Sequence, residues 1–81
     1  MNERRLTLYT RRGCPLCDEM AAALQSRLSG LQITVNTVDI DTDAELKARF
    51  GWDVPLLFAE DNEICRHVFN PVAFNAWLQG T

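Results

Sequence analysis

Two cysteines separated by two residues stand at the point where the sequence pattern changes from strand to helix. Residues 6–10 alternate in polarity and are rich in β-forming side chains, which predicts a strand that Arg12-Gly13 ends. Apolar residues then recur at helical spacing as one stripe, formed by Cys17, Met20, Ala21, Leu24 and Leu28. Pro15 suits the first position of a helix, and Ser29-Gly30 is a typical helix end. Cys14 is therefore expected at or beside the N-cap, with Cys17 one turn inside.

This position determines what the cysteine pair can do. Residues three apart in an α-helix have Cα atoms about 5 Å apart, and a disulfide requires roughly 4.4–6.8 Å, so the pair can close without backbone movement. The first turn of a helix also presents unpaired N–H groups and the positive end of the helix dipole, which favour a thiolate. Arg11 and Arg12 add positive charge nearby. We therefore expect Cys14 to be the exposed nucleophile and Cys17, on the apolar stripe, to be the resolving thiol.

Three roles compete for such a pair: half of a metal site, a structural crosslink, or a redox couple. The N-terminus has charges but no apolar signal-peptide core, and no apolar run approaches the ~18 residues of a membrane span, so a cytoplasmic protein is expected. Stable crosslinks are rare there, and a total of three cysteines would leave one unpaired, so a crosslink is the weakest of the three roles. The net charge of −3 offers no broad cationic face, which argues against nucleic-acid binding.

The rest of the chain alternates between strand and helix patterns. Strands are predicted over residues 33–38, 55–59 and 64–68, the last two joined as a hairpin by the polar turn 60–63. Helices are predicted from a capping box at residues 42–45 through Phe50 to Gly51, and from Asn70-Pro71 onward. The order β-α-β-α-β-β-α makes the first two strands parallel, through a right-handed crossover. We therefore predict one α/β domain over residues 1–81, with a four-stranded mixed sheet and helices on both faces.

Taken together, these residues resemble the glutaredoxins of the thioredoxin fold. The likeness covers nearly the whole chain and rests on a basic residue before Gly13-Cys14-Pro15-Leu16-Cys17 and on Val54-Pro55 before a strand. The short chain and its Cys-Pro-Leu-Cys variant are most similar to small bacterial glutaredoxin-like proteins of undetermined function. The resemblance implies that Pro55 is cis and faces Cys14, while the backbone of Val54 pairs with an extended substrate. The expected substrate-binding residues are Arg11, Arg12, Pro15, Leu16, Asp53, Val54 and Pro55.

Three differences separate this chain from ordinary glutaredoxins. Leu16 stands where that family has Tyr or Phe, and residues 64–71 lack the Gly-Gly turn whose helix terminus holds a glutathione carboxylate. Asp53 replaces a Thr and places negative charge beside the expected groove. Glutathione is anionic, so it is a doubtful partner, whereas disulfide exchange remains expected. The predicted function is a monomeric thiol-disulfide oxidoreductase that reduces protein or low-molecular-weight disulfides, with no cofactor except its own disulfide and no membrane or nucleic-acid partner.

Two other classes of function remain open at this point. Cys14, Cys17, Cys65 and His67 form a Cys3His set that tetrahedral zinc accepts, and a bridging iron–sulfur cluster is a related possibility. A redox-inert binding module on the same fold is the other class. Cys65 and His67 are otherwise interpreted as a small strand residue and a solvated strand residue, with a regulatory thiol as an alternative for Cys65. Trp52 and Trp77 are interpreted as packing residues, with Trp52 close enough to Asp53 to line the groove.

Overall fold

In the computed structural model, which describes residues 4–80, the chain follows the predicted order of strands and helices. The elements are β1 (Arg4–Thr10), α1 (Pro15–Leu28), β2 (Ile33–Asp39), the 3-10 turn η1 (Ile40–Thr42), α2 (Ala44–Phe50), β3 (Leu56–Ala59), β4 (Asn62–Arg66) and α3 (Pro71–Gln79). Residues 1–3 and Thr81 of the predicted 1–81 domain lie outside the described residues. Within residues 4–80, no helix is both long and apolar enough to cross a membrane.

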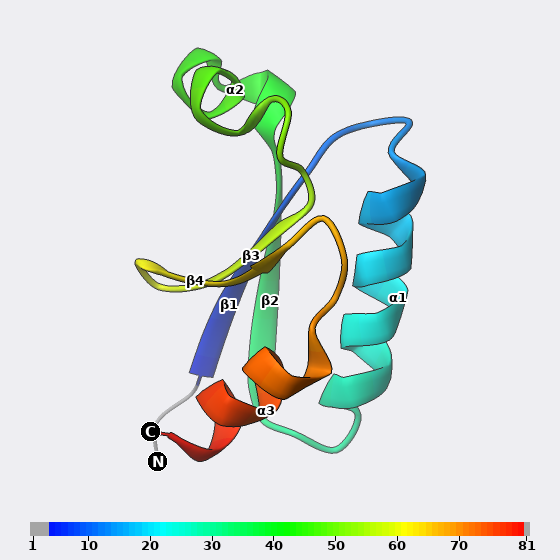
Figure 1. Cartoon of the computed structure of the whole chain (residues 1–81), viewed down its shortest axis with the longest axis vertical. Helices are drawn as coiled ribbons and strands as arrows, with labels where there is room; N and C mark the ends of the chain where they lie inside the picture. The colour runs from blue at the N-terminus through cyan, green and yellow to red at the C-terminus, as the bar shows by residue number, and fades with distance from the viewer. Residues whose placement is uncertain (1–3, 81) are drawn as a thin grey trace.

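The strands of residues 4–80 form one mixed sheet in the order β2-β1-β3-β4 (Figure 1). β1 and β2 are parallel, because α1 carries the chain back along the sheet between them. β3 is antiparallel to both of its neighbours, β1 and β4, and its pairing with β4 has an irregularity between Leu57 and Phe58. The predicted α/β class, the mixed four-stranded sheet and the closing hairpin are therefore confirmed.

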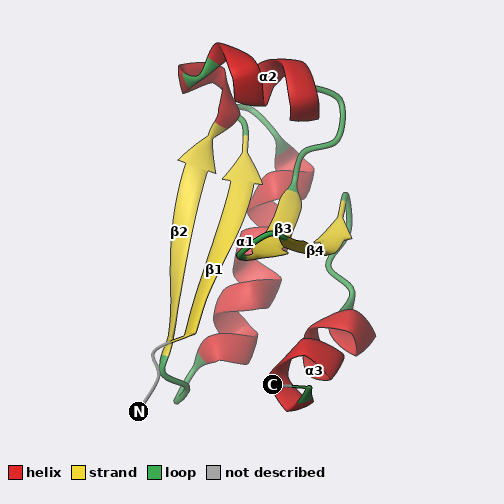
Figure 2. Cartoon of the chain, turned by 90° about the vertical axis from the view of Figure 1, so that its left-hand side faces the viewer, coloured by secondary structure: helices red, strands yellow, loops and turns green. Residues whose placement is uncertain are grey.

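Each face of the sheet carries its own apolar core, because side chains alternate along a strand. Leu6 and Leu8 of β1 point to the face that α1 and α3 cover, in a cluster with Met20, Leu24, Leu28, Leu57, Ala59, Cys65 and Phe74. Tyr9 belongs to the cluster on the other face. That cluster also contains Ile40, Leu56 and Phe58, together with Leu46 and Phe50 of α2. Figure 2 shows α1 behind β1 and β2, with α2 across the upper end of the sheet. Helices therefore cover both faces, as predicted.

The hairpin differs from its prediction in register. β4 begins at Asn62, opposite Ala59, and it ends at Arg66 rather than covering residues 64–68. The reversal after β3 needs only Glu60 and Asp61, and Glu60 takes a left-handed φ of 56°, as tight two-residue hairpin turns require. The short turn therefore brings the second strand forward by two residues.

The N-terminal cap of α2 also differs from its prediction. The capping-box pattern placed the cap at Thr42, but Thr42 ends the preceding 3-10 turn and its hydroxyl donates to the carbonyl of Asp39. Asp43 is the cap instead, because its carboxylate accepts hydrogen bonds from the backbone N–H groups of Glu45 and Leu46. The predicted end of this helix at Phe50 and Gly51 is confirmed.

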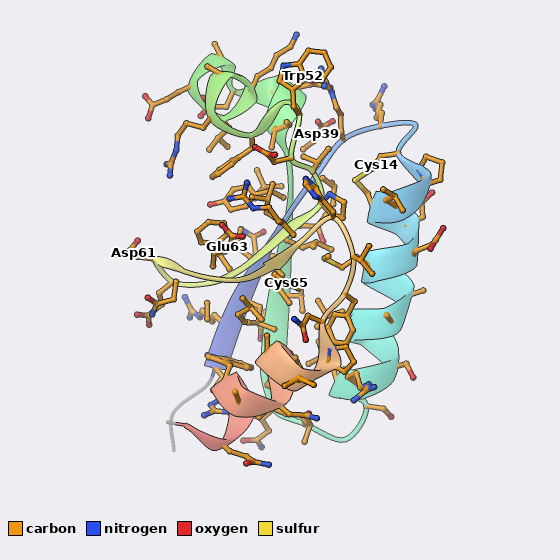
Figure 3. All side chains as sticks on the ribbon, in the orientation of Figure 1. Cys14, Asp39, Trp52, Asp61, Glu63 and Cys65 are labelled. Atoms are coloured by element: carbon orange, nitrogen blue, oxygen red, sulfur yellow. A yellow bond between two sulfur atoms is a disulfide. The ribbon has the colours of Figure 1, made fainter. Side chains whose placement is uncertain are left out.

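The two tryptophans have opposite environments. Trp77 packs against the core, with its ring 5.8 Å from that of Phe74 and the Arg4 guanidinium 4.7 Å from its centroid. Trp52 is 96% exposed, in the turn after α2 at the end of the molecule that Figure 3 shows at the top. Its interpretation as a packing residue is therefore wrong, because the turn directs the ring away from the sheet.

Candidate functional site

The cysteine pair lies at the N-terminal end of α1, as the sequence predicts, and it forms a disulfide (Figure 3). The Cα atoms of Cys14 and Cys17 are 5.2 Å apart. Cys14 is the N-cap residue, and its Sγ accepts a hydrogen bond from the backbone N–H of Cys17 at 3.1 Å. Gly13 takes a left-handed φ of 66°, which glycine adopts at little steric cost, and this turn directs the chain from β1 into α1.

The two sulfurs occupy different environments. Cys17 is 2% exposed and lies with Met20 and Leu24 on the buried stripe of α1. Cys14 is half-buried, and the neighbouring Pro15 and Leu16 are exposed. Of the two sulfurs, that of Cys14 is therefore the more accessible.

The two arginines before the motif have separate roles in the structure. Arg11 donates from Nε to Asp41 Oδ2 at 3.0 Å and from Nη1 to the carbonyl of Gly51 at 2.9 Å. These contacts join the end of β1 to η1 and to the end of α2, a structural role that the sequence did not predict. Arg12 is exposed in the turn before Gly13. Of the two guanidinium groups, that of Arg12 is the one left facing solvent near Cys14.

The segment before β3 passes beside the start of α1 (Figures 1 and 2), and we call these two segments the walls of the candidate site. The Val54-Pro55 peptide bond is cis, as the resemblance implied, and Pro55 is fully buried. The carbonyl of Pro55 accepts a hydrogen bond from the backbone N–H of His67 at 2.8 Å, which joins this segment to the turn after β4. Figures 1 and 2 both show the loop between α2 and β3 passing beside the start of α1.

An ion-pair cluster extends from this wall. Asp53 lies 3.3 Å from Nη1 of Arg66 through one carboxylate oxygen and 3.4 Å from Nε2 of His67 through the other. Arg66 also donates two hydrogen bonds to Glu63, from Nε at 2.7 Å and from Nη2 at 2.6 Å. These bonds lower the pKa of the Glu63 carboxyl and, with the charge of Asp53, raise the pKa of Arg66. The negative charge that the sequence placed at Asp53 is therefore paired with Arg66 and lies beside His67.

A pocket of about 260 Å³ lies between the first turns of α1 and the turn after β4. Its lining is mostly apolar and consists of Leu16, Glu19, Met20, Ala23, His67, Val68, Phe69 and Pro71. Leu16 and Val68 are 45% and 67% exposed, so both side chains remain available for contact. The pocket places an apolar surface directly beside the cysteine motif.

The residues of the zinc alternative do not converge. Cys65 is buried in the core cluster beside Phe74, and its burial raises the pKa of the thiol. His67 is not a strand residue, because β4 ends at Arg66 and His67 takes a left-handed φ of 68°. Among residues 4–80, no three His, Cys, Asp or Glu side chains are grouped closely enough to hold a metal ion.

Sequence reasoning did not single out Arg66, Val68 or Phe69. Arg66 reaches the site because the hairpin register places it opposite Leu56, next to the Pro55 segment. The two-residue turn that sets this register, Glu60-Asp61, lacks the Gly or Asn that usually marks such a turn. Val68 and Phe69 offered a weak signal, since they are two apolar residues in the short stretch between two elements.

The glutaredoxin-like domain family (DUF836) matches residues 5–79 of this chain. Protein Ne2328 from Nitrosomonas europaea, solved by NMR, is 32% identical over 95% of this chain and 93% of that chain, with a TM-score of 0.83. Protein XcR50 from X. campestris is also 32% identical, over 94% of this chain and 97% of that chain, with a TM-score of 0.69. No curated protein matches this sequence.

A malarial protein at 17% identity shares the fold, with a TM-score of 0.65 over 98% of this chain and 97% of that chain. The predicted thioredoxin-type α/β fold is thereby confirmed, and a cysteine pair at disulfide distance fits a thiol-redox role. From the match over residues 5–79, the chain belongs to the glutaredoxin-like domain family (DUF836).

Proposed function

We propose that this protein is a thiol-disulfide oxidoreductase whose Cys14 and Cys17 alternate between a dithiol and a disulfide. The observation that supports this most directly is the asymmetry of the pair. The two sulfurs are at bonding distance, one half-buried at a helix N-terminus and the other buried behind it. Membership of the glutaredoxin-like family adds to this support. The proposal places the protein in the cytoplasm, where two cysteines are expected to cycle rather than to form a permanent crosslink.

The exchange takes two steps in the reducing direction. The Cys14 thiolate attacks one sulfur of a substrate disulfide, which forms a mixed disulfide and releases the first substrate thiolate. Cys17 then loses its proton and attacks Sγ of Cys14, which releases the second substrate thiolate. Two electrons pass from the pair to the substrate, and each released thiolate takes up a proton. A cellular dithiol or protein thiol restores the dithiol by the reverse steps.

The start of α1 is suited to this chemistry. The N–H of Cys17 points to Sγ of Cys14, and the positive end of the helix dipole lies at the same place. Both stabilise negative charge on the attacking sulfur of Cys14 and on the same sulfur when it leaves. The substrate, in this proposal, pairs with the backbone of Val54 and contacts Leu16, which supports protein disulfides or small apolar disulfides as substrates.

Peptide mapping and turnover together test the proposal. Oxidised protein is expected to link Cys14 to Cys17 and to leave Cys65 as a free thiol. The reduced protein should reduce a disulfide-bonded peptide when a dithiol is supplied, and Cys65→Ser should retain this activity as the matched control. A disulfide that includes Cys65 would contradict the assignment. One tightly bound zinc ion per chain without turnover would instead restore the metal-binding alternative.

A further inference from the structure

Asp53 lies between two potential cations on the wall of the proposed substrate groove. Its two carboxylate oxygens face different side chains, Arg66 at 3.3 Å and His67 at 3.4 Å. The arrangement is that of a carboxylate bound in a small anion site, except that the carboxylate belongs to the chain itself. We propose that Asp53 is a specificity-determining residue that fills this site and thereby disfavours substrates bearing carboxylates. This inference rests on the thiol-disulfide exchange proposed above.

The turn that carries both potential cations, and the guanidinium of Arg66, are held in place independently of Asp53. The backbone N–H of His67 is bonded to the carbonyl of Pro55 at 2.8 Å, and that of Val68 to the carbonyl of Arg66 at 2.7 Å. This tight turn, with His67 at a φ of 68°, fixes where the side chains of residues 66 and 67 begin. Glu63 orients the Arg66 guanidinium through two further hydrogen bonds. Removal of the Asp53 charge would therefore leave a guanidinium positioned beside Pro55.

The cluster lies where a bound substrate would meet it. His67 lines the pocket that Leu16 of the cysteine motif also lines, so the cluster and the redox motif border one continuous surface. Asp53 is two residues before Pro55, in the segment proposed to pair with the substrate backbone. A carboxylate within a residue or two of the reacting sulfur would thus approach Asp53 and Arg66 together.

The charges of the cluster set the direction of the selectivity. Two carboxylates, Asp53 and Glu63, share the single guanidinium of Arg66, so these three side chains together carry net negative charge. An anionic substrate must displace Asp53 from Arg66 and also meet that charge, whereas a neutral substrate does neither. The side chains of Arg66 and Asp53 are 40% and 35% exposed, so an incoming carboxylate has direct access to the pair.

Two substrates that differ only in carboxylate charge provide the test. One is a peptide in mixed disulfide with glutathione, and the other is the same peptide with glutathione diethyl ester. The measured quantity is the ratio of the rate constants with which reduced protein reacts with the acid and with the ester. Asp53→Asn should raise this ratio about three- to fivefold, the size of effects at exposed ion pairs, and more at low salt than at high salt.

Two further variants identify the cause. Glu63→Gln is the matched control, because it removes a carboxylate from the same guanidinium on β4, where Figure 3 shows Glu63 well away from Cys14. It should change the ratio less than Asp53→Asn does. The double variant Asp53→Asn/Arg66→Gln should lose the gain, because the vacated site then has no guanidinium to receive a carboxylate.

The possible results separate this inference from the function on which it rests. A ratio that Asp53→Asn leaves unchanged would overturn the inference while exchange itself proceeds. A gain that persists in the double variant would also overturn it, since simple repulsion by Asp53 would then explain the selectivity. If folded wild-type protein, verified by circular dichroism, reacts with neither substrate, the proposed function fails and the inference fails with it.

Discussion

The two walls of the candidate redox site are built in different ways. One wall is the first turn of α1, where Cys14, Pro15 and Cys17 obtain their positions from neighbours in the sequence. The other wall combines Asp53 with Arg66, residues that the hairpin register brings together. In the proposed function, the first wall would stabilise charge on a sulfur through backbone groups, and the second would present charged side chains to a substrate. The proposed function therefore assigns reactivity and substrate choice to separate parts of the molecule.

The largest expected effect tests the α1 wall directly. Cys14→Ser should reduce disulfide reduction to the uncatalysed rate, because it removes the nucleophile. In the Cys17→Ser variant, Cys14 should still attack the substrate disulfide once. A mixed disulfide at Cys14 should then accumulate, visible as a mass increase of the intact protein. Cys65 should stay unmodified by iodoacetamide in the folded, reduced protein, because its burial raises the pKa of the thiol. Faster alkylation of Cys17 than of Cys14 would contradict the assignment of roles.

The next effect concerns what holds the α1 wall in place. Leu24 is buried on the same stripe as Cys17, so Leu24→Ala should lower the free energy of unfolding by about 2–5 kcal/mol. Val68→Ala, in the exposed turn of the opposite wall, should change it by less than about 0.5 kcal/mol. Urea denaturation monitored by circular dichroism measures both values. Equal losses of unfolding free energy in the two variants would contradict this difference, because the two walls would then contribute equally to stability.

A smaller effect is expected at the pocket between the walls. Leu16→Ala and Val68→Ala should each lower kcat/KM for a peptide disulfide with apolar flanking residues by roughly three- to tenfold, since each removes apolar contact area. A small hydroxyethyl disulfide should be affected much less. Val72→Ala is the matched control, because Val72 is exposed on α3 and does not line the pocket. Equal losses with Val72→Ala would place the contact surface elsewhere.

The smallest effect is the pH dependence of the charged wall. Arg66 lowers the pKa of Glu63 in the folded state, so the stabilising contribution is present above the unfolded pKa and is lost as pH falls through the folded value. Glu63→Gln should therefore be slightly less stable than wild type near neutral pH and indistinguishable from it in strong acid. Thermal unfolding midpoints at several pH values measure this. A difference that grows toward acid pH would have the wrong sign for this ion pair.

The α1 wall could be predicted from the sequence because every determinant of it is local. The three-residue spacing, the proline at the first helical position and the apolar stripe place Cys14 and Cys17 without reference to the rest of the chain. The cis bond at Pro55 came from the family resemblance, since only about 5–6% of X-Pro bonds are cis. Capping at Asp43 rather than Thr42 was missed because both residues fit a cap and the 3-10 turn before α2 decides between them.

The charged wall could not be predicted, because its partners are distant in the sequence. The sequence predicted a negative charge at Asp53 but no partner for it, and only the pairing of β3 with β4 brings Arg66 to it. That pairing depends on the left-handed φ of Glu60, at a residue type that does not announce a tight turn. The same register ends β4 before His67, so His67 is not part of the strand in which the sequence placed it.

The hydrogen bond from His67 N–H to the carbonyl of Pro55 has a consequence for how such a protein can diversify. Because it joins backbone to backbone, most side chains at positions 66 and 68 are compatible with it, and position 67 requires only tolerance of a left-handed φ. Descendants of one ancestral sequence can therefore exchange the charges and shapes of this turn while the cysteine helix stays unchanged. Selection at this surface would then act on a three-residue strip, and the cysteine pair would be inherited intact.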